Sequence, residues 1–332
     1  MKRAAFLCDS PERLAAVYGR GRRERVAALT DLCGPVLTAG NLADHAAAAA
    51  GVEAAFSTWG MPRLTAAQLD LLPRLGAVFY AAGSVKAFAP PLLERGITVV
   101  SAWAANARPV AEFTLAQILL ACKGYFANTR ACRAPEVRRG GGLPTGPGVF
   151  GETVGLIGAG MVGRAVCELL RGFELKVLVC DPYLPPAEAD ALGVELTSLE
   201  GLFDRAYVVS NHLPNLPSLV GYLTGAHFLR LRPGATFINT GRGAQVREDE
   251  LIAALRERPD LTALLDVTFP EPPEPDSELY RLPNALLSSH IAGSLNDELV
   301  RMADYVIEEF QRWEAGLDLR YRVTAEMLDR MA

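Results

Sequence analysis

The order of apolar and polar positions along the chain predicts two series of alternating strands and helices. Short apolar runs separated by stretches with helical spacing fill the first hundred residues, and a similar series begins after residue 150. Such alternation is typical of parallel βαβ units. The expected strands are Ala4–Cys8, Pro35–Thr38, Ala54–Ser57, Ala77–Ala81, Ile97–Ser101, Thr153–Gly158, Lys176–Cys180, Tyr207–Asn211, Thr236–Asn239, Leu264–Val267 and Leu286–Ser289.

The helices expected between these strands carry recognisable end signals. Ser10-Pro11-Glu12 offers an N-cap, a proline for the first helical position and an acid for the first turn. A longer helix is expected over Pro109–Phe126. The segment Ala134–Phe150, rich in glycine, proline and arginine, is expected to be a loop or linker.

The last long segment, Leu295–Ala315, is predicted to be an amphipathic helix that packs against the first domain. Its apolar residues recur at helical spacing. They are Leu299, Met302, Val306, Phe310 and Trp313.

Length and composition indicate a globular protein of two domains. The chain has 332 residues, of which 50% are hydrophobic and 21% charged, with a net charge of −5. This charge balance gives no reason to expect a nucleic-acid partner. We find no apolar run of the ~18–20 residues that span a bilayer, no secretory signal and no paired-cysteine spacing. A soluble cytoplasmic protein with reduced thiols, no membrane association and no metal site is therefore expected.

A glycine-rich turn supplies the sharpest local signal. The strand Thr153–Gly158 leads into Gly158-x-Gly160-x-x-Gly163, and a helix is expected directly after it. In this context the glycines allow a tight turn, close approach of a pyrophosphate, and close packing of helix on strand. Asp181 ends the next strand, where a carboxylate can bind ribose hydroxyls and repel a 2′-phosphate, which favours NAD over NADP. The alternative is a βαβ turn that binds nothing, with Asp181 as a strand-end cap.

Three polar residues lie at or just beyond expected strand ends of the second series. Arg242 can hold a carboxylate with two parallel hydrogen bonds. His290 can exchange a hydroxyl proton while a hydride moves, and Glu271 beside it would orient the imidazole. Each residue alone could be an ordinary surface or structural group. Together they are suited to the reduction of a 2-keto acid.

In these stretches the sequence resembles the D-isomer-specific 2-hydroxyacid dehydrogenase family. The matching motifs are NARPVAE at 106–112, the glycine fingerprint, PGATFINTGRG at 233–243, Asp266–Pro272 and HIAGS at 290–294. The resemblance implies two doubly wound α/β domains with parallel sheets. One is a Rossmann NAD-binding domain at 104–293. The other is a discontinuous flavodoxin-like substrate domain, residues 1–103 with 294–332.

The resemblance also implies roles for individual residues. His290 would be the acid/base, with Glu271 assisting and Arg242 binding the substrate carboxylate. Trp59, Gly83 and Ser84 would lie near the substrate, in loops of the first domain. A homodimer is expected, with NAD as cofactor. The implied cofactor-binding residues are Val110, Gly158, Gly160, Met161, Val162, Gly163, Asp181, His212, Leu213, Pro214, Thr240, Asp266 and Gly293.

Some positions depart from the family pattern, and these bear on the substrate. Ser288-Ser289 precede His290 where many members have Thr-Pro, and Lys86 replaces the aspartate of the substrate loop. The family also contains phosphoglycerate, glyoxylate, hydroxypyruvate, formate and phosphite enzymes, so the substrate stays open. A second class stays open too: an NAD(H)-sensing binding protein, because the C-terminal-binding-protein corepressors resemble this family and keep its catalytic residues.

Overall fold

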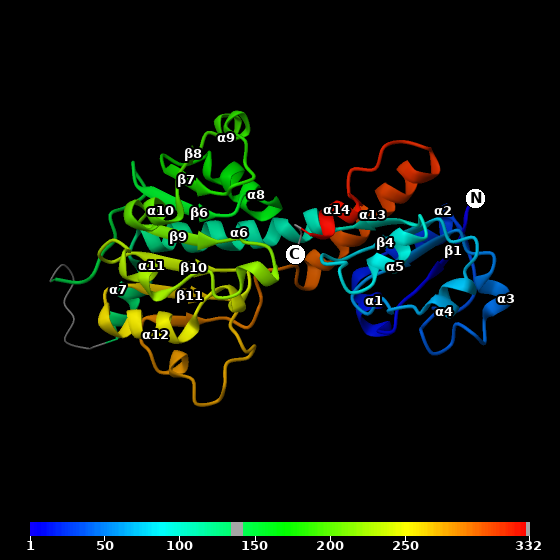
Figure 1. The fold of residues 1–332 in the computed structure, drawn as a ribbon, viewed down its shortest axis with the longest axis horizontal. Helices are drawn as coiled ribbons and strands as arrows, with labels where there is room; N and C mark the ends of the chain where they lie inside the picture. Colours follow the sequence, from blue (N-terminus) through cyan, green and yellow to red (C-terminus); the bar gives the residue numbers. More distant parts are fainter. Residues whose placement is uncertain (134–141, 330–332) are drawn as a thin grey trace. The chain divides into compact units, whose positions relative to one another are not determined.

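The computed structural model describes residues 1–133 and 142–329, which form two compact units. Unit 1 comprises Met1–Asn106 and Ser294–Ala332, and unit 2 comprises Ala107–Gly293. Each unit contains one sheet with helices on its faces (Figure 1). The expectation of two α/β domains with parallel sheets is confirmed. The domain boundary expected after residue 103 falls at the start of a helix that begins at Trp103. In the structure the first unit ends three residues later, at Asn106.

Unit 1 has a six-stranded sheet in the order β13-β5-β4-β3-β1-β2. Its strands pair in parallel except β13, which is antiparallel to β5. Without β13, this is the 2-1-3-4-5 order of flavodoxin-like folds. The strands are β1 (Arg3–Phe6), β2 (Asp31–Leu32), β3 (Ala54–Ser57), β4 (Ala77–Tyr80), β5 (Thr98–Ser101) and β13 (Arg322–Val323).

The amphipathic helix predicted near the end of the sequence is α13 (Leu299–Glu314), and its apolar face lies in the core of unit 1. Met302, Val306 and Phe310 are fully buried, and the Phe310 ring lies 5.3 Å from Phe56 and 5.5 Å from Phe79. The other helices of the unit are α1 (Pro11–Val17), α2 (Arg22–Leu29), α3 (Ala46–Ala49), α4 (Ala66–Asp70), α5 (Ala89–Glu94) and α14 (Ala325–Leu328).

Unit 2 has a seven-stranded, wholly parallel sheet in the order β12-β11-β10-β9-β6-β7-β8. The strand order reverses between β6 and β9, and ligands of such sheets bind at the carboxyl ends of the strands at this switch point. The strands are β6 (Thr153–Ile157), β7 (Lys176–Cys180), β8 (Glu195–Leu196), β9 (Val208–Asn211), β10 (Thr236–Asn239), β11 (Thr262–Leu265) and β12 (Ala285–Leu287).

Two apolar clusters cover the faces of this sheet. Side chains alternate along each strand, so that Phe237 belongs to one cluster and its neighbour Ile238 to the other. The helices are α6 (Trp103–Cys122), which begins in unit 1, α7 (Tyr125–Ala131), α8 (Met161–Leu170), α9 (Pro186–Leu192), α10 (Leu199–Arg205), α11 (Gly225–Leu229) and α12 (Glu248–Glu257). Among the described residues no single helix is long and apolar enough to cross a membrane; α6 and α7 pass together by length and composition but are bent by 60°.

Several expected elements are placed differently by the structure. The strand expected at Pro35–Thr38 is wrong: the edge strand is β2, and of that segment only Leu37 forms an isolated bridge, to Leu7. Pro109 does not begin the long helix but lies inside α6, since the alanine-rich turns before it are also helical. Of the expected loop, residues 134–141 lie outside the described residues, and 142–150 contain no helix or strand.

Candidate active site

The glycine fingerprint joins the carboxyl end of β6 to the start of α8. Gly158 has a φ of 93°, and a Cβ on it would lie 2.9 Å from the carbonyl oxygen of His212, in the loop after β9. A Cβ on Gly163 would lie 2.1 Å from the Gly158 oxygen, so α8 packs directly on the turn. A Cβ on Gly160 would meet nothing within 4 Å. The turn is therefore tight on the protein side and open at Gly160, which suits the close approach of a pyrophosphate.

Asp181, just after β7, is joined to this turn. Its Oδ2 accepts a hydrogen bond from Ala159 N at 2.6 Å, and its Oδ1 accepts one from Tyr183 N at 2.8 Å. The carboxylate thus fixes the glycine turn relative to β7. Each oxygen can accept further hydrogen bonds, so this capping role is compatible with binding a ribose diol.

His212 follows β9 at the switch point. Its Nδ1 lies 3.3 Å from Thr240 Oγ1, while its Nε2 is buried without a hydrogen-bond partner. Burial lowers the pKa of His212 to about 4, so the imidazole is neutral at physiological pH. A buried nitrogen without a partner is costly to leave unpaired. Its presence beside the glycine turn therefore fits a site that a polar ligand completes.

Arg242 lies in the loop after β10 and is partly buried. Its Nη1 donates to Gly241 O at 2.7 Å, and burial lowers its pKa although the nearby Glu271 charge opposes this. The next residue, Gly243, packs so closely that a Cβ there would lie 2.0 Å from the Thr268 carbonyl. The Arg242 loop is therefore in direct contact with the loop that carries Glu271.

His290 and Glu271 form the ion-pair geometry expected from the sequence. His290 Nδ1 lies 2.6 Å from Glu271 Oε1, and the two side chains are 46% and 42% exposed. His290 has a φ of 58°, which is uncommon for a non-glycine residue and is found at functional sites. This contact leaves Nε2 as the ring nitrogen that can exchange a proton with a substrate.

The buried carboxylate of Asp266 holds the turn around His290. Its Oδ1 accepts hydrogen bonds from Ser288 Oγ at 2.6 Å and Ile291 N at 2.9 Å, and its Oδ2 accepts one from Ala292 N at 2.9 Å. Its backbone oxygen accepts one from His290 N at 2.9 Å. In the structure Asp266 therefore anchors the histidine turn, and the hydroxyl of Ser288 takes part in this anchor.

The structure brings the remaining unit 2 candidates to the same edge of the sheet. Val110 is the exception and lies in α6, whereas the others follow the carboxyl ends of β6, β9, β10 and β12. They are Met161, Val162, Leu213, Pro214, Thr240 and Gly293. No group of three or more metal-binding side chains is found in residues 1–133 and 142–329.

The substrate-loop candidates belong to unit 1, where Trp59 follows β3 and Gly83 and Ser84 follow β4. These strands are parallel neighbours, and Thr58 Oγ1 donates to Ala81 O at 2.8 Å. The Gly83 carbonyl accepts a hydrogen bond from Ser101 Oγ, while Ser84 is exposed. The two loops are thus joined to each other at one edge of the unit 1 sheet.

Sequence reasoning missed three residues that shape the unit 2 loops after β9 and β10. Asn211, Asn239 and Gln245 are buried side-chain amides that bond one another and the backbone around Arg242. A buried polar residue at the end of a predicted strand is the only signal that could have pointed to Asn211 and Asn239. Their partners come from different loops, which the sequence does not bring together.

A parallel sheet with a glycine turn at its switch point defines a dinucleotide-binding protein. The model of the family described as "D-isomer specific 2-hydroxyacid dehydrogenase, NAD binding domain" matches residues 115–292, which is more than half of the chain. The chain therefore belongs to the D-isomer specific 2-hydroxyacid dehydrogenase family. NAD as the expected cofactor is confirmed by the same match.

Individual relatives agree with this assignment. A D-3-phosphoglycerate dehydrogenase of Mycobacterium leprae is 33% identical over 222 residues, which is 67% of this chain and 42% of the relative. The matched part thus spans less than half the length of that curated relative. A phosphoglycerate oxidoreductase from Rhizobium etli is 25% identical with a TM-score of 0.83, covering 98% of this chain and 99% of that one. The D-mandelate dehydrogenase of Rhodotorula graminis, 23% identical with a TM-score of 0.80 and 97% of each chain covered, shows the fold alone.

Proposed function

We propose that the protein is an NAD-dependent D-2-hydroxyacid dehydrogenase that interconverts a D-2-hydroxy acid and its 2-keto acid. The observation that carries this proposal is the 2.6 Å contact of His290 with Glu271, in a loop packed against the loop of Arg242. The three groups match three needs of the reaction: a proton donor, a group that orients it, and a cation for the carboxylate.

The chain's own residues would act as follows during keto-acid reduction. Arg242 binds the substrate carboxylate through its guanidinium, whose partial burial strengthens the attraction because fewer water molecules screen it. The hydride that reduces the carbonyl carbon would come from NADH when it is bound. His290 donates its proton from Nε2 to the carbonyl oxygen, and Glu271 at Nδ1 stabilises the protonated ring and its orientation. In the oxidative direction the neutral imidazole takes the hydroxyl proton.

Cofactor binding is assigned to the switch-point residues. The fingerprint glycines and the N-terminus of α8 would hold the pyrophosphate, and Asp181 the adenosine ribose. The unpaired Nε2 of His212 is available to a polar group of the cofactor. Thr240, Asp266, Leu213, Pro214 and Gly293 would line the rest of the site, with Val110 near the nicotinamide.

Arg242 is assigned to the substrate carboxylate, and the roles of Trp59, Gly83 and Ser84 near the substrate stay predictions from the sequence. The names of several relatives support including 3-phosphohydroxypyruvate among the candidates. Homodimeric assembly and a cytoplasmic location stay predictions from the sequence.

The test is NADH oxidation at 340 nm with glyoxylate, hydroxypyruvate, pyruvate, phenylpyruvate, 2-ketoisocaproate and 3-phosphohydroxypyruvate, each repeated with NADPH. We expect turnover of at least one keto acid, with preference for NADH. His290→Ala and Arg242→Ala should abolish this turnover while NADH still binds, as measured by its fluorescence. Unchanged turnover in either variant, or NADH binding without turnover of any keto acid, would contradict the proposal.

A further inference from the structure

Three buried side-chain amides join the loops that follow β9 and β10. Asn211 Nδ2 donates to Asn239 Oδ1 at 3.0 Å and to Gln245 Oε1 at 2.7 Å. Asn211 and Asn239 are the last residues of neighbouring parallel strands and are paired in register, and Gln245 ends the short 3₁₀ turn Gly243–Gln245. All three are at most 2% exposed. We call Asn211, Asn239 and Gln245 the amide network.

The amide network fixes the backbone of Arg242 from both sides. Arg242 N donates to Gln245 Oε1 at 3.1 Å, and Arg242 O accepts from Asn239 Nδ2 at 3.3 Å. The preceding amide, Gly241 N, donates to Asn239 Oδ1 at 3.1 Å. The peptide groups on either side of the Arg242 Cα are therefore held by side chains, which sets the direction in which its guanidinium leaves the backbone.

The same amides hold the loop after β9. Gln245 Nε2 donates to Leu213 O at 3.1 Å and to Pro214 O at 2.7 Å, while Leu213 N donates to Asn211 Oδ1 at 3.2 Å. Gln245 thus bonds the Arg242 loop with its oxygen and the Leu213–Pro214 loop with its nitrogen. One side chain therefore connects the proposed carboxylate-binding loop with a proposed cofactor-binding loop.

The packing around the network leaves little room for another arrangement. A Cβ on Gly241 would lie 2.9 Å from both Asn211 Nδ2 and Gln245 Oε1. Real Cβ atoms do not approach polar atoms this closely, so the glycine allows the loop to lie on the amide network. Buried side-chain amides that are hydrogen-bonded in this way are costly to disrupt, because a buried amide left unpaired loses its hydrogen bonds without compensation.

We propose that Asn211, Asn239 and Gln245 are positioning residues that hold Arg242 in the orientation needed to bind the substrate carboxylate and couple its loop to the cofactor-binding loop at Leu213–Pro214. This inference rests on the proposed function, because it takes Arg242 as the carboxylate ligand. Bidentate recognition depends on accurate placement of the guanidinium, and a misplacement of about 1 Å can cost about 100-fold in rate.

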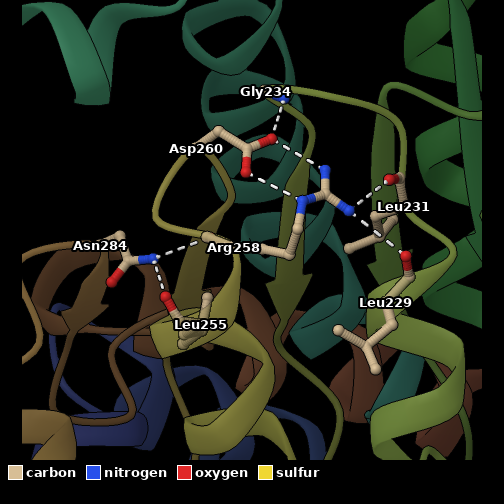
Figure 2. Close-up of polar contacts among 7 residues, drawn as sticks. All are labelled: Leu229, Leu231, Gly234, Leu255, Arg258, Asp260 and Asn284. Carbon is tan, nitrogen blue, oxygen red and sulfur yellow. Dashed lines mark hydrogen bonds and ion pairs between the residues drawn. The ribbon is translucent and has the colours of Figure 1, made fainter.

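The test compares Gln245→Met and Asn211→Ser with a matched control, Asn284→Leu. Gln245→Met keeps an unbranched side chain of similar length and removes every hydrogen bond of the amide. Asn284 is likewise buried in unit 2, and its Nδ2 donates to the carbonyls of Leu255 at 2.9 Å and Arg258 at 3.4 Å (Figure 2). It precedes β12 at the amino end of that strand and belongs to neither loop.

We expect Gln245→Met and Asn211→Ser to raise KM for the keto acid and lower kcat/KM by at least about tenfold. Gln245→Met should also weaken NADH binding, because the Leu213–Pro214 loop loses its donor. Asn284→Leu should lower the melting temperature but leave KM, kcat/KM and NADH binding as in the wild type. Wild-type constants in Gln245→Met, or the same change in Asn284→Leu, would overturn the inference.

Hydrogen exchange separates a failure of this inference from a failure of the proposed function. In both network variants the amides of Leu213, Gly241 and Arg242 should exchange faster than in the wild type, and in Asn284→Leu they should not. Unchanged exchange overturns the network's role even in an active enzyme. Faster exchange in a protein that turns over no keto acid would support the positioning of the Arg242 loop and count against the assigned reaction.

Discussion

The buried imidazole of His212 allows a quantitative prediction about pH and stability. Burial lowers its pKa from 6.5 to about 4 in the folded protein. The unfolded chain therefore binds a proton near pH 6.5, whereas the folded protein binds it only near pH 4. The contribution to stability is complete above pH 6.5 and is lost as the pH falls from 6.5 to 4. A difference of this size corresponds to about 3 kcal/mol in the limit, with about 2 kcal/mol already lost at pH 5.

His212→Asn isolates this contribution. Asparagine keeps a polar group near Thr240 Oγ1, which lies 3.3 Å from the histidine Nδ1, but it does not titrate. We expect the urea midpoint of the wild type, followed by far-UV circular dichroism, to fall more steeply between pH 7 and 5 than that of the variant. Between pH 7 and pH 5 the unfolding free energy of the wild type should therefore fall by about 2 kcal/mol more than that of the variant.

Proton NMR of the histidine rings provides a direct check, because the sequence contains only four histidines. The ring signal that is missing from His212→Asn should titrate with a midpoint near 4 in the wild type. A midpoint above 6, or identical pH dependence of the two urea midpoints, would refute the argument that the imidazole is desolvated at the switch point.

Three further substitutions test the groups around the site. Arg242→Lys keeps the charge but loses the planar fork, so kcat/KM should fall about 10- to 100-fold; an unchanged value would show that the carboxylate is bound elsewhere. Asp181→Ala should narrow the ratio of kcat/KM between NADH and NADPH, and an unaltered ratio would contradict its role at the ribose. Gly163→Ala should weaken NADH binding and cost about 1–3 kcal/mol of stability, because its Cβ would lie 2.1 Å from Gly158 O. Gly172→Ala is the control, since the nearest atom to its Cβ would be 3.9 Å away. Equal effects of the two substitutions would refute the packing argument.

The regular elements of both sheets followed from apolar patterning because a buried parallel strand needs a continuous apolar run. Lys176–Cys180 and Thr236–Asn239 are strands with the expected bounds. Of the apolar residues predicted on α13, Met302, Val306 and Phe310 are fully buried, and Leu299 and Trp313 are partly buried against the same core. The two-residue strands β2, β8 and β13 were not predicted. Two residues carry no periodicity, and pairing at a sheet edge depends on the neighbouring strand.

The site was predictable where one short segment carries its own geometry. The glycine turn is such a case, because Gly158 and Gly163 contact each other within the same motif. Asp266 is different: its carboxylate bonds residues 288, 291 and 292, more than twenty positions away. The partners of the Asp266 carboxylate are set by the path of the chain between β11 and β12. A local sequence pattern therefore cannot predict them.

The exposure of the His290–Glu271 pair determines what holds it in place. Ion pairs between side chains with this much solvent contact contribute about 0–1 kcal/mol, so the pair cannot orient its own loops. The orientation must come from buried anchors: the Asp266 carboxylate under His290 and the close contact of Gly243 with Thr268 beside the Glu271 loop. Glu271→Gln should therefore change the reaction and barely change stability, whereas loss of an anchor should change both. The buried anchors thus hold these loops in place, and the exposed pair contributes little to that.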